Sequence, residues 1–342
     1  MKRCFAYNRI TFLALLIVFS ALVSACAGKP VPITPVTPAP VTEAPTAVPT
    51  AVPTPEPTPT PVPTPEPTPS PYELTSPVYD ETKLAPFMLV NFEHECRCIG
   101  DAETQLVELH GNTPASLLLT NNDHRLNSEA VPALSAFADA FYAETGGDRL
   151  LVTSSYRTRE YQQNLYNEYV QNYGEEYARM YVADPGASEH HTGLAVDLST
   201  KNKAGERVAL INHEKFAWVT EHCSDYGFIL RYPVGTESIT HVAYEPWHFR
   251  YLGKELAKAV TAMDMTYEEF CEHIRQYTVE SGMLYLSKDL CCPDVAYIEN
   301  LPEEGYLFYY APAGGPVPVV RGADETVSAD NAGGFIVAVK IG

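Results

Sequence analysis

Two short segments of this chain hold side chains that could do chemistry together. Residues 188–198 read SEHHTGLAVDL, and residues 244–251 read YEPWHFRY. Across these segments His190, Asp197 and His248 supply two imidazoles and one carboxylate. This is the ligand set and count of a catalytic zinc site that leaves its fourth position for water. The pattern therefore predicts one zinc ion and a hydrolytic reaction.

Glu245 stands three residues before His248 and is the candidate catalytic base. Zinc lowers the pKa of its bound water to about 7, so a neighbouring carboxylate can take the proton and pass it to a leaving amine. Pro246 lies inside this Glu-x-x-His motif. Proline removes a helical hydrogen bond, so we expect a strand or turn to present the pair.

The flanking sequence predicts the elements that position these residues. Leu134, Phe137 and Phe141 recur at helical spacing between a candidate cap at Ser128 and the stop at Gly146. Further patterns predict a strand at 150–153, a helix carrying Tyr161, Leu165 and Tyr169, a helix at 216–223, strands at 228–231 and 248–252, and a helix opened by the capping box Thr266–Glu269. The whole is an α+β arrangement.

Both chemical segments resemble the VanY-type D-alanyl-D-alanine carboxypeptidases. Their signature, Ser-x-His-x-x-Gly-x-Ala-x-Asp followed by Glu-Pro-Trp-His, is matched without a gap. The resemblance extends to residues 155–157, 227–233 and 249–251, and covers roughly 79–277. It implies the zinc-dependent hedgehog/D,D-peptidase fold, in which helices pack on one face of a mainly antiparallel sheet.

The resemblance also implies roles for individual residues. The ligands would be His190, Asp197 and His248, and the base Glu245. Arg157 matches the arginine that binds the substrate's terminal carboxylate, and a guanidinium fork suits that group because it binds in two places. Taken alone, Arg157 could instead be a structural ion-pair partner.

Gln162 and Ser188 fall where such enzymes place polar contacts to the terminal D-alanine. The chain departs from the family at His191, where related enzymes more often carry glutamine. The spacing to Asp197 still selects His190 as the ligand. His191 would point to the opposite side of an extended backbone. We expect it to be a supporting or rim residue.

The N-terminus predicts export and lipid attachment. Basic residues precede an apolar run at 10–23 that is short for a membrane span, and the segment ends Val-Ser-Ala-Cys. This resembles the lipobox of bacterial lipoproteins, with residues 1–25 as signal peptide and Cys26 as lipid carrier. An ordinary signal peptide with a chance cysteine is the alternative.

The composition divides the remainder into a linker and two domains. Residues 30–72 hold 17 of the 29 prolines. Such a stretch predicts an extended stalk that could reach on the order of 130 Å at ~3.1 Å per residue. We predict a linker at 26–72, a carboxypeptidase domain at 73–277, and a small β-rich module at 278–342. This module could bind glycan or buttress the catalytic domain.

Charge and cysteine content limit the partners. The formal net charge of -20 offers no basic face for nucleic acid, so nucleic acid is not predicted as a partner. We also expect a monomer. After Cys4 and Cys26, six cysteines remain, an even number that favours disulfides in an oxidising compartment, although six allow 15 pairings. The candidate staple joins the Cys96–Cys98 pair to Cys291–Cys292. A thiol nucleophile is the alternative, but no cysteine has a recognisable catalytic setting.

We therefore predict a zinc carboxypeptidase that removes the C-terminal D-alanine of peptidoglycan stem peptides on the extracytoplasmic face of a bacterial membrane. The alternatives are an L,D-carboxypeptidase on tetrapeptides, a D,D-dipeptidase or cross-link endopeptidase, and a non-catalytic wall-binding lipoprotein. An exposed cleft without the Arg157 clamp would favour an endopeptidase. Loss of Glu245 or of a ligand would favour the binding protein, and none is lost.

Overall fold

The computed structural model describes residues 71–289 and 293–342, which belong to one compact unit, Pro69–Gly342. No helix within these described ranges is long and apolar enough to cross a membrane. The predicted signal peptide, Cys26 and nearly all of the linker lie outside the described residues. Those predictions stay untested, as do the predicted domain boundaries.

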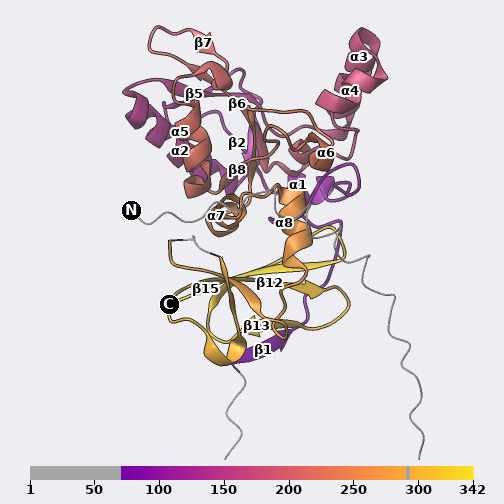
Figure 1. Cartoon of the computed structure of the whole chain (residues 1–342). Coiled ribbons are helices and arrows are strands. Elements are labelled where there is room, and N and C mark those ends of the chain that lie inside the picture. Colours follow the sequence, from indigo (N-terminus) through magenta and orange to yellow (C-terminus); the bar gives the residue numbers. More distant parts are fainter. Residues whose placement is uncertain (1–70, 290–292) are drawn as a thin grey trace, which may run out of the picture. The chain divides into compact units, whose positions relative to one another are not determined.

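A six-stranded sheet forms the centre of the part of the chain that carries the predicted ligands (Figure 1). Its strands lie in the order β3 (Leu117–Leu119), β5 (Arg149–Ser154), β6 (Ala195–Lys201), β9 (His248–Tyr251) and β8 (Phe228–Leu230), with β7 (Arg207–Val208) paired to β6. Only β3 and β5 are parallel; the other pairs are antiparallel. The predicted α+β fold with a mainly antiparallel sheet is confirmed.

Helix α2 (Ala130–Thr145) packs on this sheet because its apolar side chains recur on one face. Phe137 and Phe141 join Val152 and Val196 of the strands in one buried cluster. The helix ends at Gly146, whose φ of 65° is a left-handed conformation that glycine adopts without strain.

The predicted cap at Ser128 is wrong. The helix starts after Glu129 with no side-chain cap at that residue. The side chain of Asn127 instead accepts the backbone N–H of Glu129 at 2.9 Å, which gives the chain a turn just ahead of the helix.

Seven further helices and three 3-10 turns belong to the same part of the described chain as this sheet. They are α1 (Ile99–Glu103), α3 (Arg159–Tyr173), α4 (Glu175–Tyr181), α5 (Phe216–His222), α6 (Glu237–Thr240), α7 (Lys254–Ala262) and α8 (Tyr267–Ile274), with 3-10 turns η1 (Glu189–Thr192), η2 (Leu210–Asn212) and η3 (Cys223–Tyr226). The predicted capping box opens α8: Thr266 accepts the N–H of Glu269, whose carboxylate accepts the N–H of Thr266. A separate two-stranded pair joins β2 (Leu106–Glu108) and β4 (Arg125–Asn127).

The C-terminal residues form a second, five-stranded sheet, as the β-rich pattern predicted. Its order is β11 (Asp294–Ala296), β10 (Met283–Leu286), β12 (Gly305–Pro312), β15 (Gly334–Ile341) and β14 (Asp324–Ala329). The 3-10 turn η4 (Ile298–Asn300) follows β11, and β13 (Val317–Val320) pairs antiparallel with β1 (Tyr72–Thr75). The start of the described chain is therefore hydrogen-bonded to the C-terminal module.

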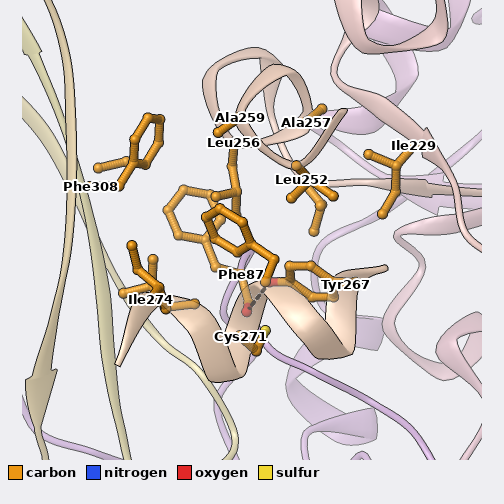
Figure 2. Close-up of a cluster of buried hydrophobic side chains, with 14 of the residues drawn as sticks. Phe87, Ile229, Leu252, Leu256, Ala257, Ala259, Tyr267, Cys271, Ile274 and Phe308 are labelled. Carbon is orange, nitrogen blue, oxygen red and sulfur yellow. Dashed lines mark hydrogen bonds between the residues drawn. The ribbon is translucent and has the colours of Figure 1, made fainter. Parts of the chain in front are cut away.

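One hydrophobic cluster is shared by α7, α8 and the C-terminal sheet (Figure 2). Phe308 of β12 packs in the same cluster as Leu256 of α7 and Ile274 of α8. The hydroxyl of Tyr267 donates to the carbonyl of Phe87, which ties the chain before α1 to the same place. The C-terminal module is thus part of the core that supports α8.

The cysteines that the structure describes are free and buried: Cys96, Cys98, Cys223 and Cys271. The sulfurs of Cys96 and Cys98 lie 3.1 Å apart. Cys223 and Cys271 belong to different hydrophobic clusters and have no cysteine partner among the described residues. The predicted staple partners, Cys291 and Cys292, lie outside those residues.

Candidate metal centre

Two neighbouring strands bring the predicted ligands together. Asp197 in β6 lies directly opposite His248, the first residue of β9, in an antiparallel register. His190 comes from η1, which ends at Gly193 with a φ of 69° immediately before β6. A tight turn on glycine can therefore return His190 to the end of the strand that carries Asp197.

The ligand atoms of His190, Asp197 and His248 all lie within 4.8 Å of one another. Asp197 Oδ1 is 3.3 Å from His190 Nε2 and 3.1 Å from His248 Nδ1. All three side chains are buried. Converging buried donors of this kind fit a small divalent cation, because they compensate its charge and each keeps a lone pair for it.

Hydrogen bonds on the far side of each imidazole fix which nitrogen faces the centre. His190 Nδ1 lies 2.6 Å from the carbonyl oxygen of Ser155, so Nδ1 carries the proton and Nε2 faces Asp197. His248 Nε2 lies 3.4 Å from Glu189 Oε2, so its Nδ1 faces the centre. Each of the two predicted histidine ligands therefore has a supporting acceptor, as metal-binding histidines usually do.

Burial and neighbouring charges set the ionisation of these groups. Burial and the positive charge of Arg157 lower the pKa of His190 to about 4, which keeps it neutral. Burial would also lower the pKa of His248, but Asp197 and Glu189 raise it to about 9. Burial raises the pKa of Asp197, yet the two histidines and Arg157 hold it well below its usual range. Without a metal ion, protonated His248 is therefore paired with ionised Asp197, and a cation that binds here would displace the His248 proton.

A buried charge network lies beneath His248. Glu189 Oε1 accepts from Arg231 Nε at 2.9 Å and from an Arg250 guanidinium nitrogen at 3.0 Å. Arg231 also donates two hydrogen bonds, of 2.7 and 2.5 Å, to the carboxylate of Glu268 in α8. We call Glu189, Arg231, Arg250 and Glu268 the charge floor.

The charge floor is anchored to α8 and to the backbone at residues 86–88. Both arginine side chains are 0% exposed, so their charges depend on these partners. Arg250 donates to the backbone carbonyls of Pro86 and Met88 at 3.2 and 2.9 Å. Since Glu268 belongs to α8, which packs on the C-terminal sheet, the support of His248 continues into that module.

Glu245 lies beside the three ligands in a turn, as Pro246 predicted. Its Oε2 is 3.7 Å from His248 Nδ1, and the side chain is buried. Burial raises the pKa of Glu245 to about 7, against a smaller lowering by the charge of His248. A carboxyl group with such a pKa can both accept and return a proton near neutral pH.

The other predicted site residues line a cleft together with the three ligands. Arg157 donates to Asp197 Oδ2 at 2.8 Å, to Ser154 Oγ at 2.9 Å and to Gln162 Oε1 at 3.4 Å. Gln162 is fully buried, and its amide nitrogen donates to the Ala183 carbonyl at 2.8 Å. The structure brings Arg157, Gln162 and Ser188 to the cleft that holds the ligand set.

His191 does not join the ligands, but the predicted reason is wrong. The segment is a 3-10 turn rather than extended backbone, and His191 is fully buried rather than at the rim. Its Nε2 accepts the N–H of Gly186 at 3.2 Å, which leaves the proton on Nδ1 to bond the Arg157 carbonyl at 2.8 Å. His191 therefore supports the backbone of Arg157.

The cleft has a volume of about 530 Å³. Its buried side carries the ligands, Glu245 and Arg157, and its other side is formed by α3 and α4. Trp247, which is 38% exposed, stands at the edge. The volume falls within the range of small-molecule sites, so a peptide end can enter.

Residues 123–254 match the family model described as VanY: D-alanyl-D-alanine carboxypeptidase. Over 128 residues the chain is 35% identical to the bifunctional D-Ala-D-Ala dipeptidase and carboxypeptidase VanXYC of Enterococcus gallinarum, covering 36% of this chain and 67% of that one. This chain belongs to the VanY family. A putative carboxypeptidase of Bacillus subtilis, YodJ, is 40% identical over 44% of this chain and 55% of its own length.

A solved structure shares the fold of this VanY-family chain. The vancomycin-resistance D,D-dipeptidase VanXYg, described in complex with a D-Ala-D-Ala phosphinate analogue, aligns with a TM-score of 0.64 and 24% identity, covering 79% of this chain and 99% of that one. The chain spans only about half the length of the curated relative YodJ.

Sequence reasoning missed the charge floor of this VanY-family site. Arg231 and Arg250 lie in segments that carry the family resemblance, and Glu189 is adjacent to His190, but each was left without a role. The available signal was a charged residue inside an otherwise apolar strand pattern, as in the run from Phe228 to Arg231. Such a residue must be paired when it is buried.

Proposed function

We propose that this protein is a zinc-dependent carboxypeptidase that removes the C-terminal D-alanine from peptidoglycan stem peptides. The observation that carries the proposal is the gathering of three buried ligand atoms within 4.8 Å beside a buried carboxyl, Glu245, and a cationic residue, Arg157. Family membership supports the same chemistry. The net charge of -20 argues against nucleic acid as the substrate.

In this proposal His190, Asp197 and His248 would hold the zinc ion. When bound, zinc supplies a Lewis acid that lowers the pKa of a coordinated water and polarises the scissile carbonyl. Glu245 then takes a proton from the attacking water and returns it to the departing amine of D-alanine. Its position next to His248 Nδ1 suits this role.

Arg157 would select the end of the peptide. A terminal carboxylate can accept two parallel hydrogen bonds from a guanidinium group, and an internal amide bond cannot. Gln162 and Ser188 line the cleft beside Arg157 and would contact the terminal D-alanine. This arrangement favours a carboxypeptidase over an endopeptidase.

We further propose that the enzyme is exported and held at the extracytoplasmic face of the membrane by lipid on Cys26. The stalk at 26–72 would then carry the catalytic domain into the cell wall. This proposal rests on the sequence alone, and globomycin treatment of producing cells tests it: the unprocessed chain should accumulate, and should not for an ordinary signal peptide.

The enzymatic proposal is tested by product identity. Purified full-length protein is incubated with a stem pentapeptide, the same pentapeptide carrying a C-terminal amide, and a tetrapeptide. We expect free D-alanine from the pentapeptide acid and at most slow cleavage of the amide, because the amide lacks the carboxylate that Arg157 binds. Release from the tetrapeptide alone would establish the L,D-carboxypeptidase.

Release of the D-Ala-D-Ala dipeptide, or equal cleavage of acid and amide, would contradict the proposal and favour a dipeptidase or an endopeptidase. Arg157→Lys provides the matched control, because it keeps the charge and loses the fork. For that variant the KM for the acid should rise by about one order of magnitude, while cleavage of the amide changes little.

A further inference from the structure

Helices α3 and α4 carry a regular row of tyrosines. Seven of the chain's 22 tyrosines fall between residues 156 and 181, and four of them are spaced every four residues: Tyr169, Tyr173, Tyr177 and Tyr181. Consecutive rings of these four lie 5.5, 5.1 and 4.6 Å apart between centroids. We call these four residues the tyrosine row. A spacing of four places Tyr169 and Tyr173 on one face of α3, and Tyr177 and Tyr181 on one face of α4.

The fold does not use the tyrosine row as core. In α3 only Gln162 is buried and in α4 only Ala178 is, and no residue of either helix belongs to a hydrophobic cluster of the described chain. Tyr173 is 61% exposed and Tyr177 is 44% exposed. Neighbouring exposed aromatic side chains of this kind mark binding surfaces.

The tyrosine row is continuous with the metal-site cleft. Tyr169, Tyr177 and Tyr181 line the same cavity as His190 and Glu245. Tyr161, which is 58% exposed, lines it as well, one turn after the Arg157 segment. A molecule whose end is held at the metal centre therefore has this aromatic surface available for the portion that precedes the cleaved bond.

The chemistry of the row suits a neutral sugar. Each tyrosine offers a flat apolar face and a hydroxyl, which complements the C–H face and hydroxyl groups of a pyranose ring. The two helices carry four glutamates, at 160, 168, 175 and 176, against two arginines, at 159 and 179. This acidic excess disfavours anionic lipid headgroups.

We propose that the tyrosine row binds the N-acetylated hexosamine of the glycan strand to which the stem peptide is attached. The inference rests on the proposed function, because the peptide fixes which molecule enters the cleft. It adds that the substrate is recognised at both ends: the terminal carboxylate near Arg157, and the sugar along α3 and α4.

The first test compares kcat/KM for D-alanine release from a free pentapeptide and from the same pentapeptide linked to its disaccharide. We expect wild-type full-length protein to prefer the disaccharide form. Tyr173→Ala combined with Tyr177→Ala should reduce that preference by about tenfold, mainly through KM. The corresponding double Phe variant keeps the rings and should retain most of the preference.

Tyr142→Ala is the matched control. Tyr142 is an exposed tyrosine in α2 that lines none of the cavities described for this chain, so its removal should leave the preference unchanged. An equal preference in wild type and the double Ala variant would overturn the sugar site, and continued D-alanine release would leave the proposed function standing.

The second test does not require catalysis. Full-length protein carrying Glu245→Gln is sedimented with insoluble glycan strands stripped of peptide, and separately with vesicles of anionic lipid. Glycan binding that the double Ala substitution abolishes supports the sugar site, even if neither peptide is cleaved. The sugar site is contradicted if the double Ala substitution abolishes vesicle binding but not glycan binding, or if it changes neither.

Discussion

Beneath the metal ligands, Glu189, Arg231 and Arg250 are fully buried and joined by ion pairs of 2.9 and 3.0 Å. On the opposite side of the cleft, Tyr177 is 44% exposed, and Tyr173, its neighbour in the tyrosine row, is 61% exposed. The charge floor is held by α8 and by the backbone near residue 87, whereas α3 and α4 make few buried contacts. The comparison indicates which side chains need a fixed geometry. Metal ligands must be held in place by packed and hydrogen-bonded neighbours, whereas a surface that contacts a long substrate can remain exposed.

The largest expected effect comes from Glu245, which lines the cleft beside the metal ligands. Glu245→Gln keeps the size of the side chain but removes the base, so D-alanine release should fall by about a thousandfold. Metal content measured by mass spectrometry should stay near the wild-type value, because Glu245 is not a ligand. Release within tenfold of wild type would contradict the assigned role.

Breaking the charge floor should give the next largest effect. Glu189→Gln leaves two buried arginines without a full counter-charge, so the free energy of unfolding should fall by about 3–5 kcal/mol. Because His248 loses its charged acceptor, metal affinity should fall by about 10–100-fold. Denaturant unfolding and competition with a chromophoric chelator measure the two effects.

The matched control for the charge floor is Glu221→Gln, at an exposed glutamate of α5. It should leave both quantities unchanged. If Glu189→Gln behaved like this control, the charge floor would not support the metal centre.

The pH dependence of kcat/KM tests the electrostatics of Glu245. Burial raises its pKa to about 7, and a bound cation would lower it again. The carboxylate is the active form, so kcat/KM should be level above the pKa and fall about tenfold per pH unit below it. The midpoint should lie at or below pH 7, and should disappear from the profile of Glu245→Gln. A midpoint well above 7 would be inconsistent with this assignment.

The smallest expected effects are on stability and come from a glycine-to-alanine substitution, made once next to the metal ligands and once between α3 and α4. Gly193 and Gly174 both have left-handed φ values, of 69° and 88°. A Cβ at Gly193 would lie 2.5 Å from Leu106 Cδ2 and 3.2 Å from the Asn127 backbone nitrogen, but at Gly174 it would meet nothing within 4 Å. Gly193→Ala carries backbone strain of about 1–2 kcal/mol and adds a steric clash. Gly174, whose ψ is 159°, lies in a region that almost only glycine adopts, so Gly174→Ala carries strain of about 1–3 kcal/mol without a clash.

Thermal unfolding should therefore show Gly193→Ala as clearly less stable than Gly174→Ala. Equal unfolding midpoints would indicate that both regions tolerate an added Cβ equally well. The difference in packing between the two regions would then be contradicted.

The sequence predicted the helices, strands and caps that follow from local residue patterns. It missed the side-chain contacts between residues that are far apart along the chain. The strand at Leu150–Val152, the helix through Phe137 and the Thr266 capping box follow from periodicity and local hydrogen bonds, and the structure has them. The pairing of Asp197 with His248 depends on sheet register across 51 residues. There the family motif, rather than the spacing, carried the prediction.

The remaining differences have physical causes. Ser128 is not the cap because Asn127 satisfies the adjacent backbone N–H. His191 is buried because the segment turns as a 3-10 helix ending at Gly193. The partnership of Glu189 with Arg231 is invisible locally, because its members are 42 residues apart.

The most direct test of the central claim is zinc titration of chelator-treated, full-length protein while D-alanine release from the stem pentapeptide is followed. We expect activity to rise linearly and to level off at one zinc per chain, with His190→Ala showing neither tight binding nor activity. Release that persists in the chelated protein, or zinc binding at one per chain without release from any stem peptide, would contradict the account.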